Sequence, residues 1–560
     1  MNILGISDTI TDSGIAYSEK GKLIMAVNEE RFTRKKTQGG FPDECLSYFL
    51  NNHDPKKVDL IVVGGILTPT LLTRAFPKLG KQNKQEARKK AIRGRLIDFL
   101  EYKLKINSRI KPDDDFAGTV KKISKKLIRK SLPKELESKP IELSEHHLNH
   151  AAATYFCSGF ENSLVVTLDG FGDGFSAKIY SVKNSNFKEV FSADALDSFG
   201  LFYSLITALC GYKQHRHEGK ITGLAAFGDA AKINIEFPFE FNEKMELKYT
   251  GSYGKKGIKN LKKELKEKSK EDISAWVQKN TEKYVCKLID YYLKETGHKN
   301  VALAGGVTAN VKLNQRIHEL DNVENIYIYP AMSDAGLSHG AILAKNRKKE
   351  VINNIYYGPE YSNQDIENEL EKNNLNYKKY QKIENKIAKI ISQGKIVARF
   401  SGRMEYGPRA LGNRTIMVQA TDPDINRSLN KKLDRTEFMP FAPVILEEYA
   451  DRCIKDLKGA ELTSKFMNIS FDVTDYMEKN CPAAVHVDKT ARPQILSKND
   501  NPGFHKILME YYEITGLPAM INTSFNAHGE PIVRTPKEAI QSFLNTDLDF
   551  LAINNFLVEK

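Results

Sequence analysis

Short apolar runs alternate with polar turns over the first 30 residues and predict a series of strands. Asn2–Ser7 is apolar, Asp8–Ser13 is polar, and Gly14–Ser18 resumes with residues that favour β-strands. Glu19–Gly21 has the composition of a hairpin turn, and Lys22–Val27 is the next apolar run. We therefore expect three strands at the start of the first domain, with a polar loop at the first bend.

A second unit of the same kind begins near residue 164. Leu164–Leu168 predicts a buried strand, Asp169–Gly174 a tight turn and Phe175–Val182 another strand. The glycines of this turn would let the backbone approach a ligand closely. Two strand–acidic loop–strand units in one chain resemble the halves of the actin-like ATPase fold. The pattern thus favours an α/β protein with a duplicated, actin-like N-terminal domain.

Apolar residues recur at helical spacing between Leu71 and Pro140, a stretch that is also rich in Lys and Arg. We expect two or three amphipathic helices, inserted in the first domain at about 71–140. The residues at this spacing are Ile97, Leu100, Leu104, Val120, Ile123, Leu127 and Ile128.

A further helix is predicted from the apolar stripe between Val285 and Leu293. Thr281 is the expected N-cap of this helix, and Gly297 is the expected C-cap. A short strand at Asn300–Ala304 should follow.

The polar, Asn-rich stretch Lys345–Asn363 predicts a domain boundary. We expect domains at 1–352 and 353–560, because the pattern restarts beyond this stretch. The elements expected there are a helix at Ile383–Gln393, a strand at Lys395–Phe400, a helix ending at Gly516 and a strand at Ala519–Asn522.

The net charge of the chain comes from one segment. The 560 residues include 84 Lys and Arg and 71 Asp and Glu, a formal net charge of +13. Leu71–Glu135 alone contains 20 basic and 7 acidic residues, so the other 495 residues are neutral in sum. A high pI can indicate a nucleic-acid binder. Here it indicates a near-neutral protein with one basic segment, and we do not expect nucleic acid as its main partner.

Composition excludes several classes of protein. A hydrophobic content of 41% excludes a disordered chain, and the length predicts more than one domain. No apolar run of about 18 residues predicts a membrane span, and the N-terminus lacks the pattern of a signal peptide. The cysteines are scattered without a CxxC pair, which favours buried, reduced thiols and a cytoplasmic location. They are Cys45, Cys157, Cys210, Cys286, Cys453 and Cys481.

A metal site is predicted around His146 and His150. Four residues apart on a helix, they would share one face and could chelate one ion. Ala151–Ala153 follows directly and favours the helix. Asp169 and Asp334 would complete a set of two nitrogen and two oxygen donors, which suits Fe²⁺ or Zn²⁺. For each aspartate alone, a turn or helix cap is the other interpretation.

Two Gly-rich segments are candidates for binding phosphate. Gly305–Asn310, between a strand and a helix, could offer backbone N–H groups to a nucleotide, or could simply be a tight turn. Gly402–Arg414 holds three Arg and three Gly, and guanidinium groups bind phosphate bidentately. This favours a pocket for an anionic phosphate compound over a surface salt-bridge cluster. Further candidates downstream are Lys432, Arg435, Arg492 and the loop Asn522–Asn526.

Together these motifs resemble those of the O-carbamoyltransferases of natural-product and nodulation-factor biosynthesis. The matching stretches run in family order from about residue 3 to 535, and Gly402–Arg414 is the most specific of them. They are Glu29–Lys35, His146–Ala153, Asp169–Gly170, Glu218–Ala225, Gly305–Asn310, Gly402–Arg414, Phe441–Pro443, Ala491–Gln494 and Asn522–Asn526.

The resemblance implies an actin-like (ASKHA, TsaD-like) N-terminal domain, a YrdC-like C-terminal domain and two half-reactions. In the C-terminal domain, carbamoyl phosphate and ATP, the latter with Mg²⁺, would give carbamoyl-adenylate, phosphate and pyrophosphate. In the N-terminal domain, the carbamoyl group would pass to a hydroxyl of a small molecule or glycan beside Fe²⁺ or another divalent metal.

The resemblance also implies residue roles. The metal ligands would be His146, His150, Asp169 and Asp334. The nucleotide-binding part of the N-terminal domain would include Gly305, Gly306 and Asn310. Arg414 would be catalytic, and the contacts to carbamoyl phosphate and ATP would come from Arg403, Arg409, Asn413, Arg414, Lys432, Arg435, Arg492, Ser524 and Asn526.

The chain departs from the family pattern in two places. Members usually carry a His, a candidate general base, where this chain has Thr11. A neutral hydroxyl cannot accept a proton near pH 7 as imidazole does. Asp12, His147 or another histidine could serve as the base, or the acceptor is more acidic than a sugar hydroxyl, or the site is altered. Met439 replaces a usual Arg, and a Lys is shifted relative to Arg435, so we expect fewer phosphate contacts there.

Two other functions stay open. A nucleic-acid or membrane-surface binding protein with reduced catalysis would use the insertion Leu71–Glu135. A small-molecule kinase on the actin-like half would leave the C-terminal half without a purpose. The insertion itself could be a solvated helical face, or a basic lip that attracts anionic substrates. The sequence leaves a homodimer open.

Overall fold

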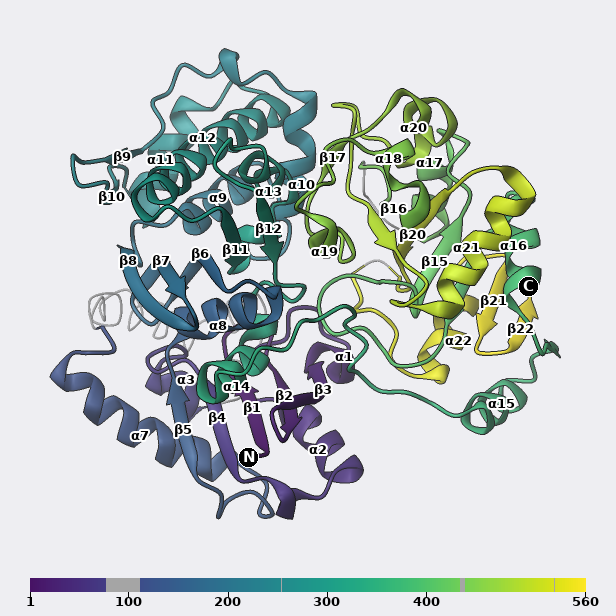
Figure 1. The fold of residues 1–560 in the computed structure, drawn as a ribbon, viewed down its shortest axis with the longest axis horizontal. Helices are drawn as coiled ribbons and strands as arrows, with labels where there is room; N and C mark the ends of the chain where they lie inside the picture. The colour runs from purple at the N-terminus through teal and green to yellow at the C-terminus, as the bar shows by residue number, and fades with distance from the viewer. Residues whose placement is uncertain (77–110, 253, 434–438, 528) are drawn as a thin grey trace. The chain divides into compact units, whose positions relative to one another are not determined.

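The computed structural model of the chain divides into two compact units (Figure 1). Unit 1 comprises Met1–Thr33 and Thr37–Val351, and unit 2 comprises Arg34–Lys36 and Ile352–Lys560. The structure describes residues 1–76, 111–252, 254–433, 439–527 and 529–560. The expected helix around Ile97, Leu100 and Leu104, and the candidate Arg435, lie outside the described residues.

Two five-stranded sheets of identical connectivity form the centre of unit 1. In each sheet three antiparallel strands are followed by two strands that join in parallel. This repeat is the duplication that the sequence predicts. The first sheet has the order β3-β2-β1-β4-β5, with β1 Ile3–Ser7, β2 Gly14–Glu19, β3 Lys22–Asn28, β4 Leu60–Gly64 and β5 Ile141–Ser144. The second has the order β12-β11-β6-β7-β8, with β6 Asn162–Gly172, β7 Phe175–Lys183, β8 Asn186–Asp194, β11 Asn300–Ala304 and β12 Asn325–Ile328. A separate hairpin consists of β9 Phe239–Phe241 and β10 Leu247–Tyr249.

Helices α8 and α14 lie close together in unit 1 because α14 has glycine at the contact. A Cβ on Gly340 would lie 2.2 Å from the backbone oxygen of Asn149 in α8. The helices of unit 1 are α1 Glu30–Thr33, α2 Asp43–Asn52, α3 Leu71–Ala75, α7 Asp115–Ser131, α8 His146–Ser158, α9 Phe199–Leu209, α10 Glu218–Leu224, α11 Gly254–Glu264, α12 Lys270–Thr296, α13 Val311–His318 and α14 Leu337–Asn346.

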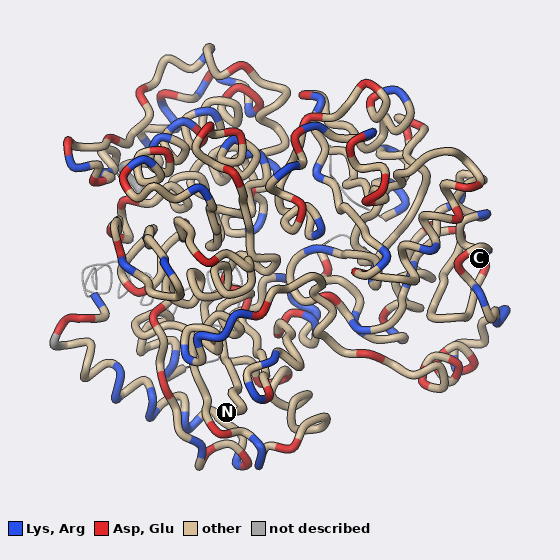
Figure 2. The backbone as a smooth tube through the Cα atoms, in the orientation of Figure 1, with Lys and Arg blue, Asp and Glu red and all other residues tan. Residues whose placement is uncertain are grey.

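The described end of the insertion is part of the core of unit 1. Ile128 in α7, with Leu132 and Leu136 after it, belongs to the same apolar cluster as Leu4 and Ile6 of β1. The basic residues of α7, visible as blue segments in Figure 2, are Lys121, Lys122, Lys125, Lys126, Arg129 and Lys130. The helix therefore packs on one side and carries most of its charge on the other.

The prediction that Thr281 caps a helix is wrong. Helix α12 begins three turns earlier, where the side chain of Ser269 accepts a hydrogen bond from the backbone N–H of Asp272 at 3.0 Å. Thr281 is 2% exposed in the helix interior, because the apolar face continues upstream through Trp276 and Val277. The predicted end is confirmed: Gly297 caps the helix with a φ of 72°.

The predicted turn at Asp169–Gly174 is shorter than expected. Strand β6 continues to Gly172, and the chain reverses at Asp173 and Gly174, whose φ values are 48° and 87°. The pairing of β6 with β7 shifts between Leu168 and Gly172, which leaves Asp169 in an irregular part of the strand.

An eight-stranded mixed sheet forms the centre of unit 2, in the order β13-β22-β21-β14-β15-β20-β16-β19. The predicted strands near Lys395 and Ala519 and the helix ending at Gly516 are confirmed as β14, β20 and α21. The strands are β13 Tyr377–Lys379, β14 Val397–Phe400, β15 Arg414–Val418, β16 Pro443–Leu446, β19 Gln494–Leu496, β20 Ala519–Ser524, β21 Phe550–Ile553 and β22 Phe556–Glu559, with a separate pair β17 Phe471–Asp472 and β18 Thr490–Ala491. The helices are α15 Asn363–Lys372, α16 Glu384–Ser392, α17 Ile425–Lys432, α18 Ala450–Cys453, α19 Glu461–Ser464, α20 Asp475–Asn480, α21 Pro502–Thr515 and α22 Pro536–Leu544.

The sequence predicts neither a membrane-spanning helix nor a disulfide bond, and the described residues can be compared with both predictions. Within those ranges, no helix has both the length and the apolar composition needed to cross a bilayer. The six cysteines are unpaired, and all except Cys286 are buried, as the sequence predicts.

Replacing Gly340 with Ala is expected to destabilise unit 1, because the added methyl would meet the backbone of α8. Overpacking of this kind costs about 1–3 kcal/mol. Denaturant unfolding would measure it. Gly118→Ala in α7 is the matched control, since nothing lies within 4 Å of its added Cβ. That change should leave stability equal or raise it by roughly 0.5–1 kcal/mol. Equal midpoints for the two variants would contradict the close α8–α14 contact.

Candidate functional site

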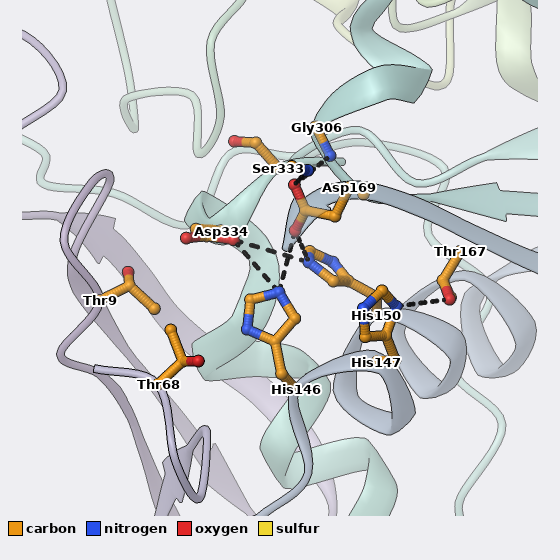
Figure 3. A network of polar contacts seen from close by, with 12 residues as sticks. Thr9, Thr68, His146, His147, His150, Thr167, Asp169, Gly306, Ser333 and Asp334 are labelled. Carbon is orange, nitrogen blue, oxygen red and sulfur yellow. Dashed lines mark hydrogen bonds and ion pairs between the residues drawn. The ribbon is translucent and has the colours of Figure 1, made fainter. Parts of the chain in front are cut away.

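Four side chains that the sequence predicts as metal ligands converge in unit 1 (Figure 3). His146 and His150 come from the first two turns of α8, Asp169 from β6, and Asp334 from the short helix Asp334–Gly336 that follows β12. One potential ligand atom from each of the four lies within 4.8 Å of the others. Nε2 of His146 and Nε2 of His150 lie 2.9 and 3.2 Å from the same carboxylate oxygen of Asp169.

Each carboxylate of the cluster has one oxygen held by neighbours and one facing the histidines. Oδ1 of Asp169 accepts from the backbone N–H groups of Gly170 and Gly306, at 2.7 and 3.3 Å. Oδ2 of Asp334 accepts from the Thr11 hydroxyl at 3.5 Å, while Oδ1 lies 3.6 Å from His146 Nε2. The inward-facing oxygens are thus oriented before any ion binds.

Backbone contacts also position the start of α8. Glu145 caps the helix and accepts from the N–H groups of His147 and Leu148. The Asp173 carboxylate accepts from the His146 N–H at 2.9 Å. Gly172 is required beside the ring, because a Cβ there would lie 2.1 Å from the Cδ2 atom of His146.

The cluster neutralises its own charge by holding protons. Burial opposes the charged form of His146, but the hydrogen bond with Asp169 and the charges of Asp334 and Asp169 raise its pKa to about 10. The pKa of His150 is also raised, because its hydrogen bonds with Asp169 and Asp334 outweigh burial. The two histidines in turn hold the pKa of Asp169 well below its usual range despite burial.

These residues fit a divalent cation. Two imidazole nitrogens and two carboxylate oxygens form a donor set for Zn²⁺ or Fe²⁺. Ligands bound tetrahedrally at about 2.0–2.2 Å would lie about 3.3–3.6 Å apart, close to the distances between these side chains. A cation would replace the proton on His146, so binding is coupled to proton release.

His147 and Asp12, the two residues predicted as bases, have different surroundings. His147 is fully buried, and its Nδ1 and Nε2 atoms contact the Thr167 hydroxyl at 2.8 Å and the Phe175 carbonyl at 3.1 Å. Its ring is therefore fully engaged by its own unit. Asp12 accepts from the Ser333 hydroxyl at 3.1 Å, next to the cluster. Burial, with repulsion from nearby carboxylates, raises the pKa of Asp12 to about 7.

The Gly305–Asn310 segment approaches the same cluster. Gly305 has a φ of 98°, and a Cβ on it would lie 2.2 Å from the Leu168 carbonyl. The segment continues as one turn of 3₁₀ helix, and Asn310 then caps α13 by accepting from the Leu313 N–H. Its amide also pairs with Gln278 at 2.8 and 3.2 Å. Asn310 is thus committed to shaping this segment.

In unit 2, the loop 402–414 is organised by Glu405, which the sequence analysis missed. One of its carboxylate oxygens accepts from the N–H groups of Leu411, Asn413 and Arg414, at 2.9, 2.8 and 3.1 Å. The signal was a single acidic residue within an Arg- and Gly-rich loop. A buried carboxylate with three backbone donors fixes the path of the loop.

Arg414 lies inside this loop rather than at its surface. The side chain is fully buried over the Phe400 ring, 3.6 Å from its centroid. Its terminal nitrogens donate to four backbone carbonyls. Those carbonyls belong to Ser401, Asn413, Gly402 and Pro359. Burial lowers its pKa to about 10. These contacts assign Arg414 to the frame of the loop.

Arg409 and Arg492 form a pair of half-buried cations without a counter-ion among the described residues. Burial lowers the pKa of Arg409 to about 10, and its Nε atom is buried without a hydrogen-bond partner. Burial and the charge of Arg409 hold the pKa of Arg492 well below its usual range. Two neighbouring cations that repel each other favour an anion between them.

Most of the other residues predicted as ligands in unit 2 donate hydrogen bonds to backbone carbonyls of that unit. Arg403 donates to the carbonyls of Gly358 and Tyr357. Asn413 holds the Arg403 carbonyl, Asn526 those of Ala527 and Glu530, and Lys432 that of Asp547. Ser524 is half-buried at the end of β20, paired with Thr415 of β15.

The chain matches known proteins over nearly its whole length. Residues 2–343 match the family described as carbamoyltransferase N-terminus, and residues 388–560 match carbamoyltransferase C-terminus. An uncharacterised protein of Methanocaldococcus jannaschii is 35% identical over 100% of this chain and 99% of its own length. Nodulation protein NolNO of Sinorhizobium fredii is 28% identical over 100% of this chain and 80% of its own. Nodulation protein NolO of Bradyrhizobium diazoefficiens is 32% identical over 74% of this chain and 78% of its own.

The cluster of unit 1 should bind one Zn²⁺ ion and release at least one proton as it does so, because the raised pKa of His146, about 10, keeps that ring protonated in its absence. Affinity should therefore rise with pH. Calorimetric titration in buffers of different ionisation enthalpy would count the protons.

His150→Ala should weaken this binding by at least the roughly 10–100-fold that loss of a supporting contact costs. His298→Gln is the control, since His298 lies outside the cluster, where its Nε2 atom contacts the Ser181 hydroxyl at 2.8 Å. Equal affinities for the two variants, or binding without proton release, would contradict this assignment.

Proposed function

The chain belongs to the carbamoyltransferase family, and from this we propose that it is an ATP-dependent O-carbamoyltransferase with two half-reactions. In unit 2, carbamoyl phosphate reacts with water to give carbamate and phosphate. A carbamate oxygen then attacks the α-phosphorus of ATP, bound with Mg²⁺, and pyrophosphate leaves. In unit 1, the carbamoyl carbon of the resulting carbamoyl-adenylate accepts a hydroxyl oxygen of the acceptor, and AMP leaves.

The pair Arg409 and Arg492 is the observation that carries the first half-reaction. Carbamoyl phosphate and ATP are both anions, and bringing them together costs free energy unless cations offset the repulsion. Two half-buried guanidinium groups without a counter-ion among the described residues supply that charge. We assign Arg409 and Arg492 as the phosphate ligands, with Arg403, Lys432, Arg435, Ser524 and Asn526 as further candidates.

Arg414, Asn413 and Glu405 would serve this half-reaction through the shape of the loop 402–414. Their contacts are all internal to unit 2, so they orient Arg409 rather than touch the anion. This gives the most specific motif of the sequence a physical reason, since a loop of fixed shape is needed to bury an unpaired cation.

The four-residue cluster supports the second half-reaction. A divalent cation bound to His146, His150, Asp169 and Asp334 would act as a Lewis acid toward the carbamoyl group. Asp12 would take the proton from the acceptor hydroxyl, because its carboxylate lies beside the cluster with a pKa raised to about 7. His147 has no free ring nitrogen for this task.

The Gly305–Gly306 turn supports a nucleotide site next to the cluster. The Gly306 N–H contacts Asp169, and a backbone without side chains can approach the adenylate closely. Asn310 would act by holding the following helix in place. We also propose that unit 1 is actin-like and unit 2 YrdC-like, with the acceptor a small molecule or glycan that has a free hydroxyl.

Arg409→Ala and Arg492→Ala should each lower pyrophosphate release from carbamoyl phosphate and ATP by about 10–100-fold, the worth of a charge-assisted contact. The rate of pyrophosphate release by Arg409→Lys should lie between those of the wild type and Arg409→Ala, because lysine keeps the positive charge but lacks the forked guanidinium. Arg427→Ala is the control, since that side chain is 90% exposed on α17. Wild-type release by both alanine variants would contradict the anion site.

Asp12→Asn should leave pyrophosphate release unchanged and abolish carbamoyl transfer, because the amide cannot accept a proton. In the wild type, transfer should decline as pH falls below about 7, where Asp12 becomes protonated. Mass spectrometry with ¹³C-carbamoyl phosphate and glycerol as a probe acceptor would follow transfer. Asp321→Asn, at an exposed position, is the control. Transfer by Asp12→Asn at the wild-type rate would exclude this base.

A further inference from the structure

Arg74 is the buried point at which the insertion meets the rest of unit 1. The side chain is 5% exposed, and its guanidinium forms a fork with the carboxylate of Asp8 at 2.9 and 3.2 Å. The terminal nitrogens also donate to the carbonyls of Gly65 and Ile66, at 2.8 and 3.0 Å, and to the Ser124 hydroxyl at 3.0 Å. All five N–H groups of Arg74 are therefore used.

These contacts join four segments of chain. Arg74 lies in α3, where the insertion begins, and Ser124 lies in α7, near its end. Gly65 and Ile66 follow β4, and Asp8 follows β1. One guanidinium thus joins both described ends of the insertion to the carboxyl ends of β1 and β4 in the first sheet.

Asp8 is the first residue of the loop Asp8–Ser13, whose other side rests on the segment Gln38–Gly40. The Gly40 N–H donates to the Thr9 carbonyl at 2.8 Å, and the Ser13 N–H donates to the Gln38 carbonyl at 2.9 Å. A Cβ on Gly39 would lie 2.2 Å from the Ile10 carbonyl oxygen. The loop is therefore confined between Arg74 and this segment.

The same loop contacts the metal cluster. Thr11 donates to the Asp334 carboxylate at 3.5 Å, and Ser333 donates to Asp12 at 3.1 Å. Ser7, just before the loop, donates to the Asp334 carbonyl at 3.4 Å. A displacement of Asp8 would reach these contacts within three or four residues.

A contribution to stability alone explains Arg74 poorly. Removing two charges from water costs about as much as a buried ion pair returns. What the arrangement supplies is position, because a planar fork with five donors fixes the distances among several segments at once.

We propose that Arg74 is a positioning residue for carbamoyl transfer: it holds the loop Asp8–Ser13 against Asp334 and couples the two ends of the insertion to that loop. This inference rests on the proposed function of unit 1. It gives the basic segment of the chain a mechanical role that is independent of its net charge.

Amide hydrogen exchange of the full-length protein tests the anchoring without any reaction. Arg74→Lys retains a charge for Asp8 but cannot reach all the acceptors, so exchange across residues 9–13 should quicken by about tenfold or more. Exchange in β6 and β11 should stay as in the wild type. Ser124→Ala should show a smaller change in the same loop. Lys122→Ala, exposed on α7, is the control and should show none.

The two half-reactions test the role. With glycerol as probe acceptor, Arg74→Lys should lower kcat for carbamoyl transfer by up to about 100-fold, while pyrophosphate release and the KM for carbamoyl phosphate stay unchanged. Gly39→Ala, which pushes the loop from its other side, should reproduce this pattern with the ion pair intact.

Unchanged exchange in residues 9–13 of Arg74→Lys, or wild-type transfer by that variant, would overturn the proposal. An equal loss of both half-reactions would also overturn it, since that outcome indicates a general loss of folding. If the wild type releases no pyrophosphate, the proposed function fails, but the exchange experiment still decides whether Arg74 anchors the loop.

Discussion

The arrangement of unit 1 depends on holding two imidazoles and two carboxylates within 4.8 Å of each other in a largely buried place. Charges of one sign would be too costly there, and protons retained at the cluster, where the pKa of His146 is raised to about 10, provide the balance. The surrounding structure serves this requirement. Gly172 leaves space for the His146 ring, and Gly340 allows α14 to approach α8, the helix that carries both histidines. A cation that replaces those protons would meet ligands already oriented by their neighbours.

Unit 2 handles buried charge in the opposite way. Arg414 is balanced within its loop by backbone carbonyls, and Glu405 by backbone N–H groups. The free energy that these contacts supply holds the loop that carries Arg409, and both Arg409 and Arg492 remain without a counter-ion among the described residues. The cluster of unit 1, whose charges offset one another, suits a permanently bound cation. The pair Arg409 and Arg492, which has no counter-ion among the described residues, suits an anionic substrate that binds and dissociates. In the proposed function, the first half-reaction needs the anion site and the second needs the cation site.

The contacts of the insertion, rather than its net charge, indicate its role in unit 1. Its charge accounts for the whole net charge of +13, yet among the described residues it is Arg74 and Ser124, both buried, that connect it to the loop Asp8–Ser13. Ile128 anchors the same helix in the apolar core. Within the described residues, the contacts between the insertion and this loop are thus shielded from water.

Local patterns in the sequence determined the strands and the duplicated units, and the family resemblance implied the four residues that converge in unit 1. Alternation of apolar and polar residues marks β1 to β3, a glycine marks the end of α12, and histidines four residues apart need only a helix to share a face. The start of α12 was missed at Thr281, because burial of its first turns depends on side chains far along the chain. Arg414 and Arg409 look alike in the sequence. Only the tertiary structure separated them, because the acceptors around a guanidinium come from segments that folding brings together: four backbone carbonyls accept from the terminal nitrogens of Arg414, and such acceptors decide whether an arginine supports a loop or is left to bind an anion.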